Sequence, residues 1–509
     1  MTITGARAPR PPAARRTGPF WSSPAVGLAA TIVAVAGSSR VSQSSDELAT
    51  LSAARRSAAG LWELAQHVDG HFLPYYAFMH LWVGFGQAEW WLRLPSAVAT
   101  GAAAALIAGL GRRLHSPPAG VTAGIVYALL PSVSHHGQNV RPYAFAAAAA
   151  VLSTWALYRA IEEPEWRGGR WRYAASLALL GCTQVFALLV LAAHLLAVTL
   201  HRRGVLGRIL PGMALGCVPG AVWAVVGFNE RSAISWIEMP EPAVFLALPE
   251  MAGGTAPAGG ILLTLALAGP LLARRHHVHR LWTTLLAGWA VLPPVLLFGM
   301  SHLISPVYVD RYLFATVPAY ALLAGLALAS VSSPLAALAL TAAFAAGLPG
   351  HLDVRREDGH YENFPRAVRI ISDNARPGDA IMYNGSWLRT GMLYYGGRSL
   401  PDDVLLTDAE PRPDSFNYHE RADIAAVLDG HGRVWVLWRG KAGRSGRAGS
   451  GSDRLGTLVR AGFTKDRSWY VGRSHGMTVA LYTRQAGLAS NPAADLASRT
   501  PHRRRDADR

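Results

Sequence analysis

The feature that most constrains the fold is a series of apolar stretches that recurs through the first two thirds of the chain. A helix needs about 20 apolar residues to cross the hydrocarbon core of a bilayer. Only 16% of the 509 residues are charged, whereas a soluble domain usually has about a quarter. The sequence therefore predicts an α-helical polytopic membrane protein. We expect about eleven transmembrane helices, at 20–37, 94–110, 119–133, 143–160, two within 173–200, 209–228, 260–273, 281–300, 312–330 and 334–348.

One of these stretches, 173–200, is too long for a single span. As one helix with a rise of 1.5 Å per residue it would measure about 42 Å, more than the roughly 30 Å of the hydrocarbon core. We therefore expect two short helices with a break near residues 181–184. Two helices also place the following arginines, Arg202, Arg203 and Arg208, on the same side as the other arginine-rich loops.

Arginine residues indicate the orientation of the expected spans. The loops after the second, fourth, sixth and eighth spans are rich in arginine, and such loops stay in the cytoplasm. We therefore expect a multi-pass protein of the cell membrane with the amino terminus in the cytoplasm and the carboxy-terminal region outside. The net charge of +16, from 48 basic and 32 acidic residues, is attributed to these loops. No nucleic acid partner is expected, because no basic stripe is interleaved with aromatic side chains.

The chain divides into four expected segments. Residues 1–18 are expected to form a disordered basic cytoplasmic tail, and residues 19–349 the membrane domain, whose first outer loop is 38–93. Residues 350–485 are expected to form a small extracytoplasmic α/β domain, and 486–509 a disordered tail. In the α/β domain we expect helices at 365–376, 388–395 and 419–428, and strands at 380–383, 404–406, 434–438, 468–473 and 477–484.

Two adjacent carboxylates, Asp46 and Glu47, follow the first span near the outer membrane face. Adjacent side chains on a helix diverge by about 100°, so they are not expected to act on one atom. One is expected to be a general base, and the other to cap a helix or contact an acceptor. The alternative is a plain helix start with Ser44 or Ser45 as N-cap. Apolar residues of 46–64 recur at helical spacing, which predicts short helices at the membrane interface.

Arginines in the outer loops are exceptions to the orientation rule. Arg141 and Arg311 each stand in a dense polar cluster with a nearby tyrosine, Tyr143 and Tyr312 respectively. The planar fork of donors on arginine suits a phosphate group. We therefore expect these four residues to bind the phosphate of a lipid-borne substrate. For Arg93, contact with lipid headgroups is the favoured alternative.

A third carboxylate and a histidine, Asp69 and His71, stand later in the first outer loop. Together they are a candidate half-site for a divalent cation, which Asp46 or Glu47 would complete. A divalent cation is the one cofactor that the sequence leaves open, and the identity of any metal ligand set is unknown. No phosphate-binding glycine loop, dinucleotide fingerprint or nucleophile elbow is evident.

These residues resemble a known family, the C superfamily of glycosyltransferases that use polyprenyl-phosphate sugars, including protein O-mannosyltransferases and bacterial membrane mannosyltransferases. The likeness covers roughly residues 20–350. It depends on the order of five motifs along the chain and on their expected location on the same side of the membrane. The motifs are Asp46-Glu47, Asp69-Gly70-His71-Phe72-Leu73-Pro74-Tyr75-Tyr76, Trp91-Leu92-Arg93-Leu94-Pro95-Ser96, Gln138-Asn139-Val140-Arg141-Pro142-Tyr143, and Arg311-Tyr312-Leu313 with Pro318.

The resemblance implies a sugar transfer with inversion at the outer membrane face. The sugar, expected to be mannose, leaves a polyprenyl-phosphate carrier, and the acceptor is a hydroxyl of a protein, a lipid or a cell-wall glycan. Asp46 takes the acceptor proton, with Glu47 as the second catalytic carboxylate, and Arg141 and Arg311 stabilise the departing phosphate. Asp69, His71, Tyr75 and Arg93 belong to the substrate loop.

Two other functions remain as alternatives. A transporter or flippase for a lipid-linked glycan would place charged residues at mid-membrane and often shows two related halves. The expected spans are nearly free of charge and no internal repeat is evident, so the sequence favours the enzyme. A non-catalytic membrane scaffold that presents its outer domain is the second alternative.

Chemical labelling can check the expected orientation. Ser45→Cys and Ser415→Cys should each react with an impermeant thiol reagent in intact cells, because both positions lie in segments expected outside. The native Cys182 and Cys217 lie in apolar stretches, and the unsubstituted protein gives their background. Protection at both positions in intact cells, with labelling after lysis, would overturn this orientation.

Overall fold

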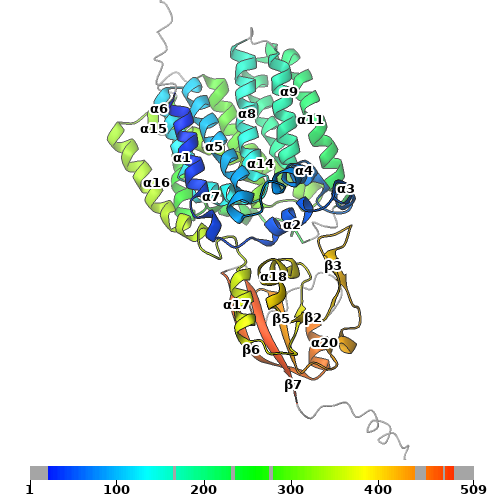
Figure 1. Cartoon of the computed structure of the whole chain (residues 1–509). Coiled ribbons are helices and arrows are strands. Elements are labelled where there is room, and N and C mark those ends of the chain that lie inside the picture. Colours follow the sequence, from blue (N-terminus) through cyan, green and yellow to red (C-terminus); the bar gives the residue numbers. More distant parts are fainter. Residues whose placement is uncertain are drawn as a thin grey trace, which may run out of the picture. The chain divides into compact units, whose positions relative to one another are not determined.

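The computed structural model of the chain describes residues 21–163, 168–230, 236–273, 279–441, 454–473 and 476–485. These residues form two compact units (Figure 1). The first unit holds the chain up to Val41 together with Ala49–Gly359, and the second holds Ser42–Leu48 together with the chain from His360. The assignment of Ser42–Leu48 to the second unit was not expected from the sequence. The expected tails at 1–18 and 486–509 lie outside the described residues.

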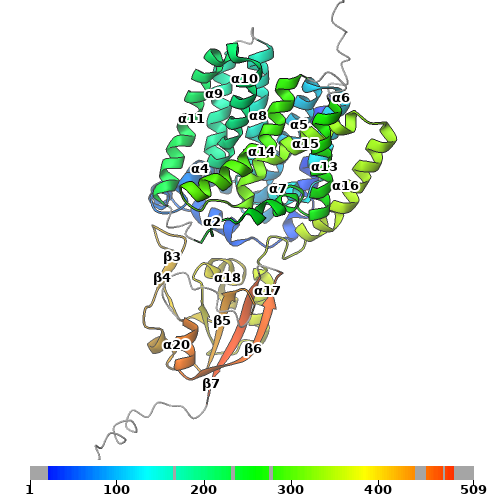
Figure 2. The ribbon, with the colours of Figure 1, turned by 180° about the vertical axis from the view of Figure 1, so that it is seen from behind.

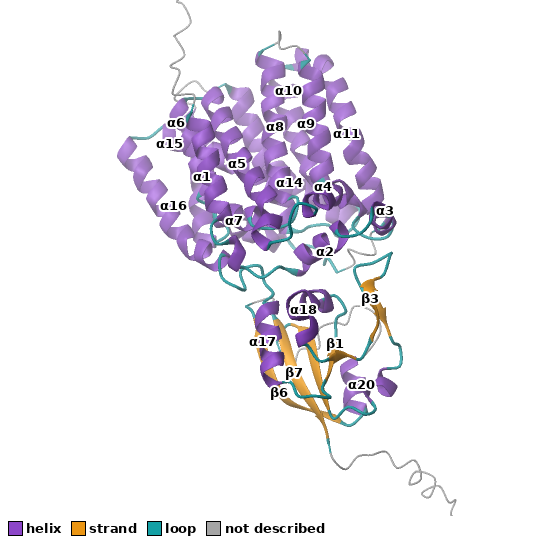
Figure 3. Cartoon of the chain, viewed as in Figure 1, coloured by secondary structure: helices purple, strands orange, loops and turns teal. Residues whose placement is uncertain are grey.

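The described part of the first unit is helical, without strands (Figure 3). A helix stands at the place of each of the eleven expected spans. The long expected stretch at 173–200 is divided where the sequence indicated, because one helix ends at Thr183 and the next begins at Val190. The eleven helices are α1 (Ser22–Val35), α5 (Glu89–Leu114), α6 (Pro117–Ala128), α8 (Tyr143–Glu162), α9 (Gly169–Thr183), α10 (Val190–His201), α11 (Leu206–Asn229), α13 (Ala256–Ala273), α14 (Arg280–Leu303), α15 (Val317–Ala329) and α16 (Ser333–Val354).

Fewer than eleven of these helices span a bilayer by length and composition alone. In the described ranges, seven helices are long and apolar enough to cross a bilayer. The count rises to eight if Pro242–Gly253 and Ala256–Leu272, which meet at a bend of 94°, together form one span. The helices α6, α9 and α10 contain only 12, 15 and 12 residues, less than the bilayer core requires. The protein is thus an α-helical polytopic membrane protein, with some helices shorter than full spans.

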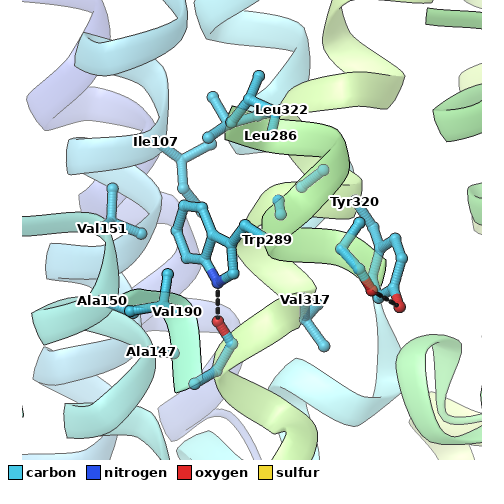
Figure 4. Packing of buried hydrophobic residues seen from close by; sticks show 14 of the residues in the cluster. Ile107, Ala147, Ala150, Val151, Val190, Leu286, Trp289, Val317, Tyr320 and Leu322 are labelled. Carbon is cyan, nitrogen blue, oxygen red and sulfur yellow. Dashed lines mark hydrogen bonds between the residues drawn. The ribbon is translucent and has the colours of Figure 1, made fainter. Parts of the chain in front are cut away.

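Small residues and satisfied polar groups hold this bundle together. A Cβ atom added to Gly181 on α9 would lie 2.7 Å from the Cα of Gly220 on α11, so the two helices approach closely only because both residues are glycine. Trp289 on α14 is fully buried, and its indole N–H donates to the carbonyl of Ala315 at 2.9 Å (Figure 4). The bond fixes η8 (Asp310–Thr316), the segment that carries Arg311 and Tyr312, against α14.

Short helices occupy the loop that follows α1, as expected. They are α2 (Ser45–Ala54), α3 (Ala58–Ala65), η2 (Gly70–Phe72) and α4 (Leu73–Val83). The helical pattern at 46–64 is two helices and not one, because Ser57 caps α3 by accepting the Gly60 N–H at 3.2 Å. The helix α4 lies at the same end of the bundle as α7 (Pro131–Gly137) in both views (Figures 1 and 2).

The second unit contains the small α/β fold expected from the sequence. Its five-stranded sheet has the order β2-β1-β5-β7-β6. The strand β1 runs parallel to β2 and β5, and β7 runs antiparallel to β5 and β6. The strands are β1 (Ala380–Tyr383), β2 (Asp402–Asp403), β5 (Arg433–Arg439), β6 (Phe463–Val471) and β7 (Met477–Arg484), and the main helices are α17 (Phe364–Asn374) and α18 (Leu388–Gly396).

Two local expectations for this unit were wrong. The expected strand at 404–406 falls mainly between β2 and β3 (Leu406–Pro411), and the first part of the expected helix 419–428 lies in β4 (Tyr418–Glu420), which pairs with β3. Buried Arg389 explains both errors, because it binds Asp403 at 2.5 Å and Glu420 at 2.8 Å. Aspartate and glutamate have a low intrinsic preference for strands, and the ion pairs with Arg389 allow Asp403 and Glu420 to occupy them.

Candidate active site

A tight turn at Asp69 and Gly70 begins the candidate site in the first unit. Asp69 has a φ of 54°, a left-handed conformation that aspartate adopts more readily than most residues. The next N–H, that of Gly70, donates to a carboxylate oxygen of Glu230 at 2.9 Å. A Cβ atom on residue 70 would overlap the carbonyl oxygen of Ala65. Glycine is therefore required there, and the turn aims the Asp69 side chain at Tyr76.

A chain of hydrogen bonds joins Arg141, Tyr76 and Asp69. The Arg141 guanidinium donates to the Tyr76 hydroxyl at 3.1 Å, and that hydroxyl donates to the Asp69 carboxylate at 2.8 Å. Burial, reinforced by the charge of Asp69, raises the pKa of Tyr76 well above its usual value, so the phenol stays neutral. Arg141 is only 5% exposed, with its guanidinium 4.5 Å from the centre of the Phe72 ring. It also donates to the Thr50 hydroxyl at 3.5 Å.

Arg311 and Tyr312 lie in the same electrostatic environment as this chain. The charges of Arg311, Arg141 and Asp69 all act on Tyr312, as does Tyr143. The Tyr312 ring stacks on Phe186 with 5.0 Å between centres. The structure thus gathers the four residues expected to bind phosphate near the Asp69 turn. Guanidinium and phenol groups together offer the donors that a phosphate dianion needs.

Aromatic rings support Arg311 and Tyr143. The Arg311 guanidinium lies 5.5 Å from the Trp236 ring and 5.8 Å from the Tyr312 ring. The buried Tyr143 ring lies 5.3 Å from that of His136. Stacking on a ring holds a guanidinium by its face and leaves its N–H edge for hydrogen bonding.

The other expected residues of the substrate loop have different surroundings. Burial lowers the pKa of His71, with Asp69 acting in the opposite direction, so its imidazole is neutral at physiological pH. Tyr75 is buried, with its ring 5.8 Å from that of Phe145. Arg93 is only 1% exposed and donates to the carbonyl oxygens of Ser38 and Val41. Arg93 therefore holds the chain that follows α1, and the expected contact with lipid headgroups was wrong.

The part of the chain that the structure describes contains no group of three His, Cys, Asp or Glu side chains placed to hold a metal ion. The divalent-cation hypothesis for Asp69 and His71 therefore gains no support from the geometry.

Sequence reasoning missed Glu230. This residue lies beside the Asp69 turn and is only 7% exposed. One carboxylate oxygen accepts the Gly70 N–H, and the other has no hydrogen-bond partner among the described residues. Burial raises the pKa of Glu230 to about 7, and the charge of Asp69 adds to the effect while the Gly70 N–H opposes it. Its position just after an apolar stretch, like that of Asp46, was the available signal.

In the second unit, the structure gives the two adjacent carboxylates different surroundings. Ser44 and Glu47 form a capping box: the Ser44 N–H donates to Glu47 at 2.9 Å, and the Glu47 N–H donates to the Ser44 hydroxyl at 3.3 Å. Glu47 is fully buried, with the same carboxylate oxygen 2.9 Å from Nδ1 of His360. The alternative of a plain helix start therefore accounts for Ser44 and Glu47. Asp46 is partly exposed.

The pKa of Glu230 leads to a stability prediction for Glu230→Gln. Between the ordinary value of 4.5 and the folded value of about 7, the unfolded chain has lost this proton and the folded protein keeps it. The neutral Glu230 carboxyl therefore makes its full contribution to the free energy of unfolding below pH 4.5, and this contribution is lost as the pH rises through 7. Glutamine keeps an oxygen for the Gly70 N–H but never ionises. It should stabilise the protein at pH 8 by about 1 to 2 kcal/mol, after allowance for solvent screening, and have less effect at pH 5.

The measurement is the midpoint of thermal unfolding of the detergent-purified protein at both pH values. Glu250→Gln is the matched control, because Glu250 is an exposed carboxylate of the same unit on α12 (Leu248–Gly253). The control variant should differ from wild type equally at pH 5 and pH 8. An equal difference for Glu230→Gln would contradict the prediction.

Two kinds of comparison find known proteins that are similar to this chain. The family model described as dolichyl-phosphate-mannose-protein mannosyltransferase matches residues 74–225, which include Tyr76, Arg93, Arg141 and Tyr143. A search of curated protein sequences finds no match. The structure is similar to that of ArnT from Cupriavidus metallidurans bound to undecaprenyl phosphate, with a TM-score of 0.56 and 16% identity over 90% of this chain and 97% of that chain.

Two further solved structures show weaker similarity. Arabinofuranosyltransferase AftD from Mycobacteria has a TM-score of 0.47 and 19% identity over 92% of this chain and 40% of that chain. The oligosaccharyltransferase of Archaeoglobus fulgidus tethered to an acceptor peptide has a TM-score of 0.48 and 12% identity over 82% of this chain and 69% of that chain. Residues 74–225 thus match the dolichyl-phosphate-mannose-protein mannosyltransferase family model, and over 90% of its length the chain shares the fold of the ArnT structure.

Proposed function

We propose that the protein transfers a sugar from a polyprenyl-phosphate carrier to an acceptor hydroxyl. The observation that carries this proposal is buried Arg141, bonded to Tyr76 and through it to Asp69. The hydroxyls of Tyr76 and Thr50 accept hydrogen bonds from the guanidinium and hold it in place. Such an arginine is prepared to receive an anionic group at low cost in reorganisation.

Arg141 and Arg311 are the proposed phosphate ligands. When the bond between the anomeric carbon and the carrier oxygen breaks, negative charge grows on the leaving phosphate. Guanidinium groups placed beforehand stabilise that charge more in the transition state than in the ground state. Tyr143 and Tyr312 are proposed to contribute hydroxyl donors to the same phosphate.

Asp46 is the proposed general base. The acceptor hydroxyl gives its proton to Asp46 as its oxygen bonds to the anomeric carbon, and the carrier departs as polyprenyl phosphate with the bonding electrons. Attack on the face opposite the leaving group inverts the configuration of the sugar. Glu47 is committed to the capping box and to His360, so it is proposed to fix the helix start and not to accept the proton. Asp46 lies in the first turn of α2, where the helix dipole favours a negative charge.

Mannose is the proposed sugar, and the supporting observation is the family model that matches residues 74–225. The bound lipid in the ArnT structure supports an undecaprenyl-type carrier for this protein too. The proposed orientation keeps the amino terminus in the cytoplasm and both the first outer loop and the second unit outside, where the acceptor is a hydroxyl of a protein, a lipid or a cell-wall glycan.

The test is transfer of labelled sugar by the purified full-length protein from synthetic polyprenyl-phosphate mannose, with polyprenyl-phosphate arabinofuranose as the competing donor. Envelope membranes from a strain that lacks the protein supply the acceptor. Wild type should transfer mannose, and Asp46→Asn should lose about 10²- to 10⁴-fold in turnover, the usual contribution of a general base. Asparagine is nearly isosteric and tolerated at helix starts, so folding and donor binding should survive.

Glu63→Gln provides the matched control, because Glu63 is an exposed carboxylate on α3 of the same outer loop. It should keep normal turnover. Preference for the arabinofuranose donor would overturn the assignment of mannose. Near-normal transfer by Asp46→Asn would remove Asp46 from the mechanism and leave Asp69 as the candidate base.

Phosphate binding by Arg141 and Arg311 gives a separate prediction. A charge-assisted hydrogen bond contributes about 1.5 to 3 kcal/mol, so either Arg→Ala variant should lower turnover at least about tenfold. Arg→Lys should restore only part of it, because lysine lacks the planar fork. The control is Arg202→Ala, since Arg202 is exposed at the end of α10. Full turnover by both folded alanine variants would assign the two arginines to structure alone.

A further inference from the structure

The second unit encloses the start of α2 in a cluster of polar groups, here named the first-turn cluster: Ser44, Ser45, Glu47, His360, Glu362 and Arg439. Glu362 is only 2% exposed, and one of its oxygens accepts the Ser45 hydroxyl at 3.1 Å and the Arg439 guanidinium at 2.8 Å. His360 lies 2.9 Å from Glu47. The side chains of residues 360 and 362 therefore hold both neighbours of Asp46 in the sequence.

The first-turn cluster lies at the edge of the sheet formed by the carboxyl ends of the parallel strands β1 and β5. Parallel strands β1 and β5 end at Tyr383 and Arg439, and Arg439 binds Glu362 from the carboxyl end of β5. In open α/β sheets, ligands usually bind beyond the carboxyl ends of parallel strands. Here that edge receives Ser42–Leu48, the segment of the chain that contains Asp46.

The backbone between the two holding residues is strained. Tyr361 has a φ of 86°, which is rare for a bulky residue. Its neighbours, His360 and Glu362, both bind the first turn of α2. Such strain persists only where surrounding contacts enforce it, and it gathers at functional sites.

Electrostatics connects Glu362 to Asp46 directly. Burial raises the pKa of Glu362, Arg439 and Ser45 oppose this, and the charge of Asp46 raises it further. The Asp46 carboxylate therefore lies within electrostatic range of Glu362. A buried carboxylate beside another carboxylate is unfavourable unless its partners compensate, and here the partners are Arg439 and Ser45.

We propose that Glu362 and His360 are positioning residues for Asp46, so that the second unit aims the catalytic base. This inference rests on the proposed function. Glu362 fixes Ser45 and the Glu47–His360 pair fixes the capping box, so the backbone on both sides of Asp46 is held in place. The alternative is that these contacts only stabilise the second unit.

The first test is kinetic and uses the full-length chain with synthetic polyprenyl-phosphate mannose as donor. Glu362→Gln should lower kcat about tenfold or more, the effect of a lost charge-assisted bond, without changing the KM for the donor. In the Asp46→Asn background the same substitution should cost nothing further, because a residue that acts through Asp46 has no effect once that carboxylate is gone. An equal loss in both backgrounds would overturn the proposal.

Asp379→Asn is the matched control. Asp379 is a 5% exposed carboxylate at the opposite end of β1, where it binds Arg433 at 3.0 Å and Trp435 at 2.9 Å. If destabilisation of the second unit were the cause of lost turnover, this variant would lose turnover as well. It should instead keep the wild-type kcat.

The second test does not depend on activity. Amide hydrogen exchange of peptides that cover 42–54 should become faster in Glu362→Gln and in His360→Gln, and stay unchanged in Asp379→Asn. Unchanged exchange in both first-turn variants would overturn the proposal even if the protein is a glycosyltransferase. Faster exchange with no transfer by wild type from either sugar donor would support the positioning contacts while rejecting the proposed function.

Discussion

A guanidinium group removed from water is stable only where its surroundings supply partners, and the first unit is arranged to meet this requirement for Arg141. The partners come from separate parts of the chain: Thr50 on α2, Phe72 in η2 and Tyr76 on α4. The Arg141 segment is itself anchored, because Ser96 on α5 donates to the Asn139 carbonyl at 2.7 Å. Without the close packing of the bundle these groups would not meet, so the apolar helices are the means by which a polar site is assembled.

Asp46 and Glu47 show how surroundings divide the roles of chemically similar neighbours. Both stand in the first turn of α2, and nothing in their spacing distinguishes a base from a cap. The third position of a helix is where a carboxylate reaches back to the N-cap N–H, and that position belongs to Glu47 because Ser44 is the N-cap. His360 then completes the burial of Glu47. Asp46, one residue earlier, lies outside the capping box and is partly exposed.

Much of the fold could be predicted because its signals are local. Apolar stretches identify helices whatever their partners are, and the break before Val190 followed from the length of the stretch and from the arginines after it. Strands β1 and β7 are short, mostly apolar runs between turns. Contacts between distant residues could not be predicted: Gly70 and Glu230 are 160 positions apart, and Glu47 and His360 are 313 apart. Each of these depends on the finished fold, and no local pattern encodes it.

The difference between local signals and contacts of distant residues also explains which part of the candidate site is detected by sequence comparison. The matched stretch, 74–225, contains Tyr76 and Arg141, whose hydrogen bond is internal to it. Asp46 and Glu362 lie outside it, and their association depends on the second unit. In the proposed reaction, charge stabilisation by Arg141 and proton acceptance by Asp46 thus have separate physical supports.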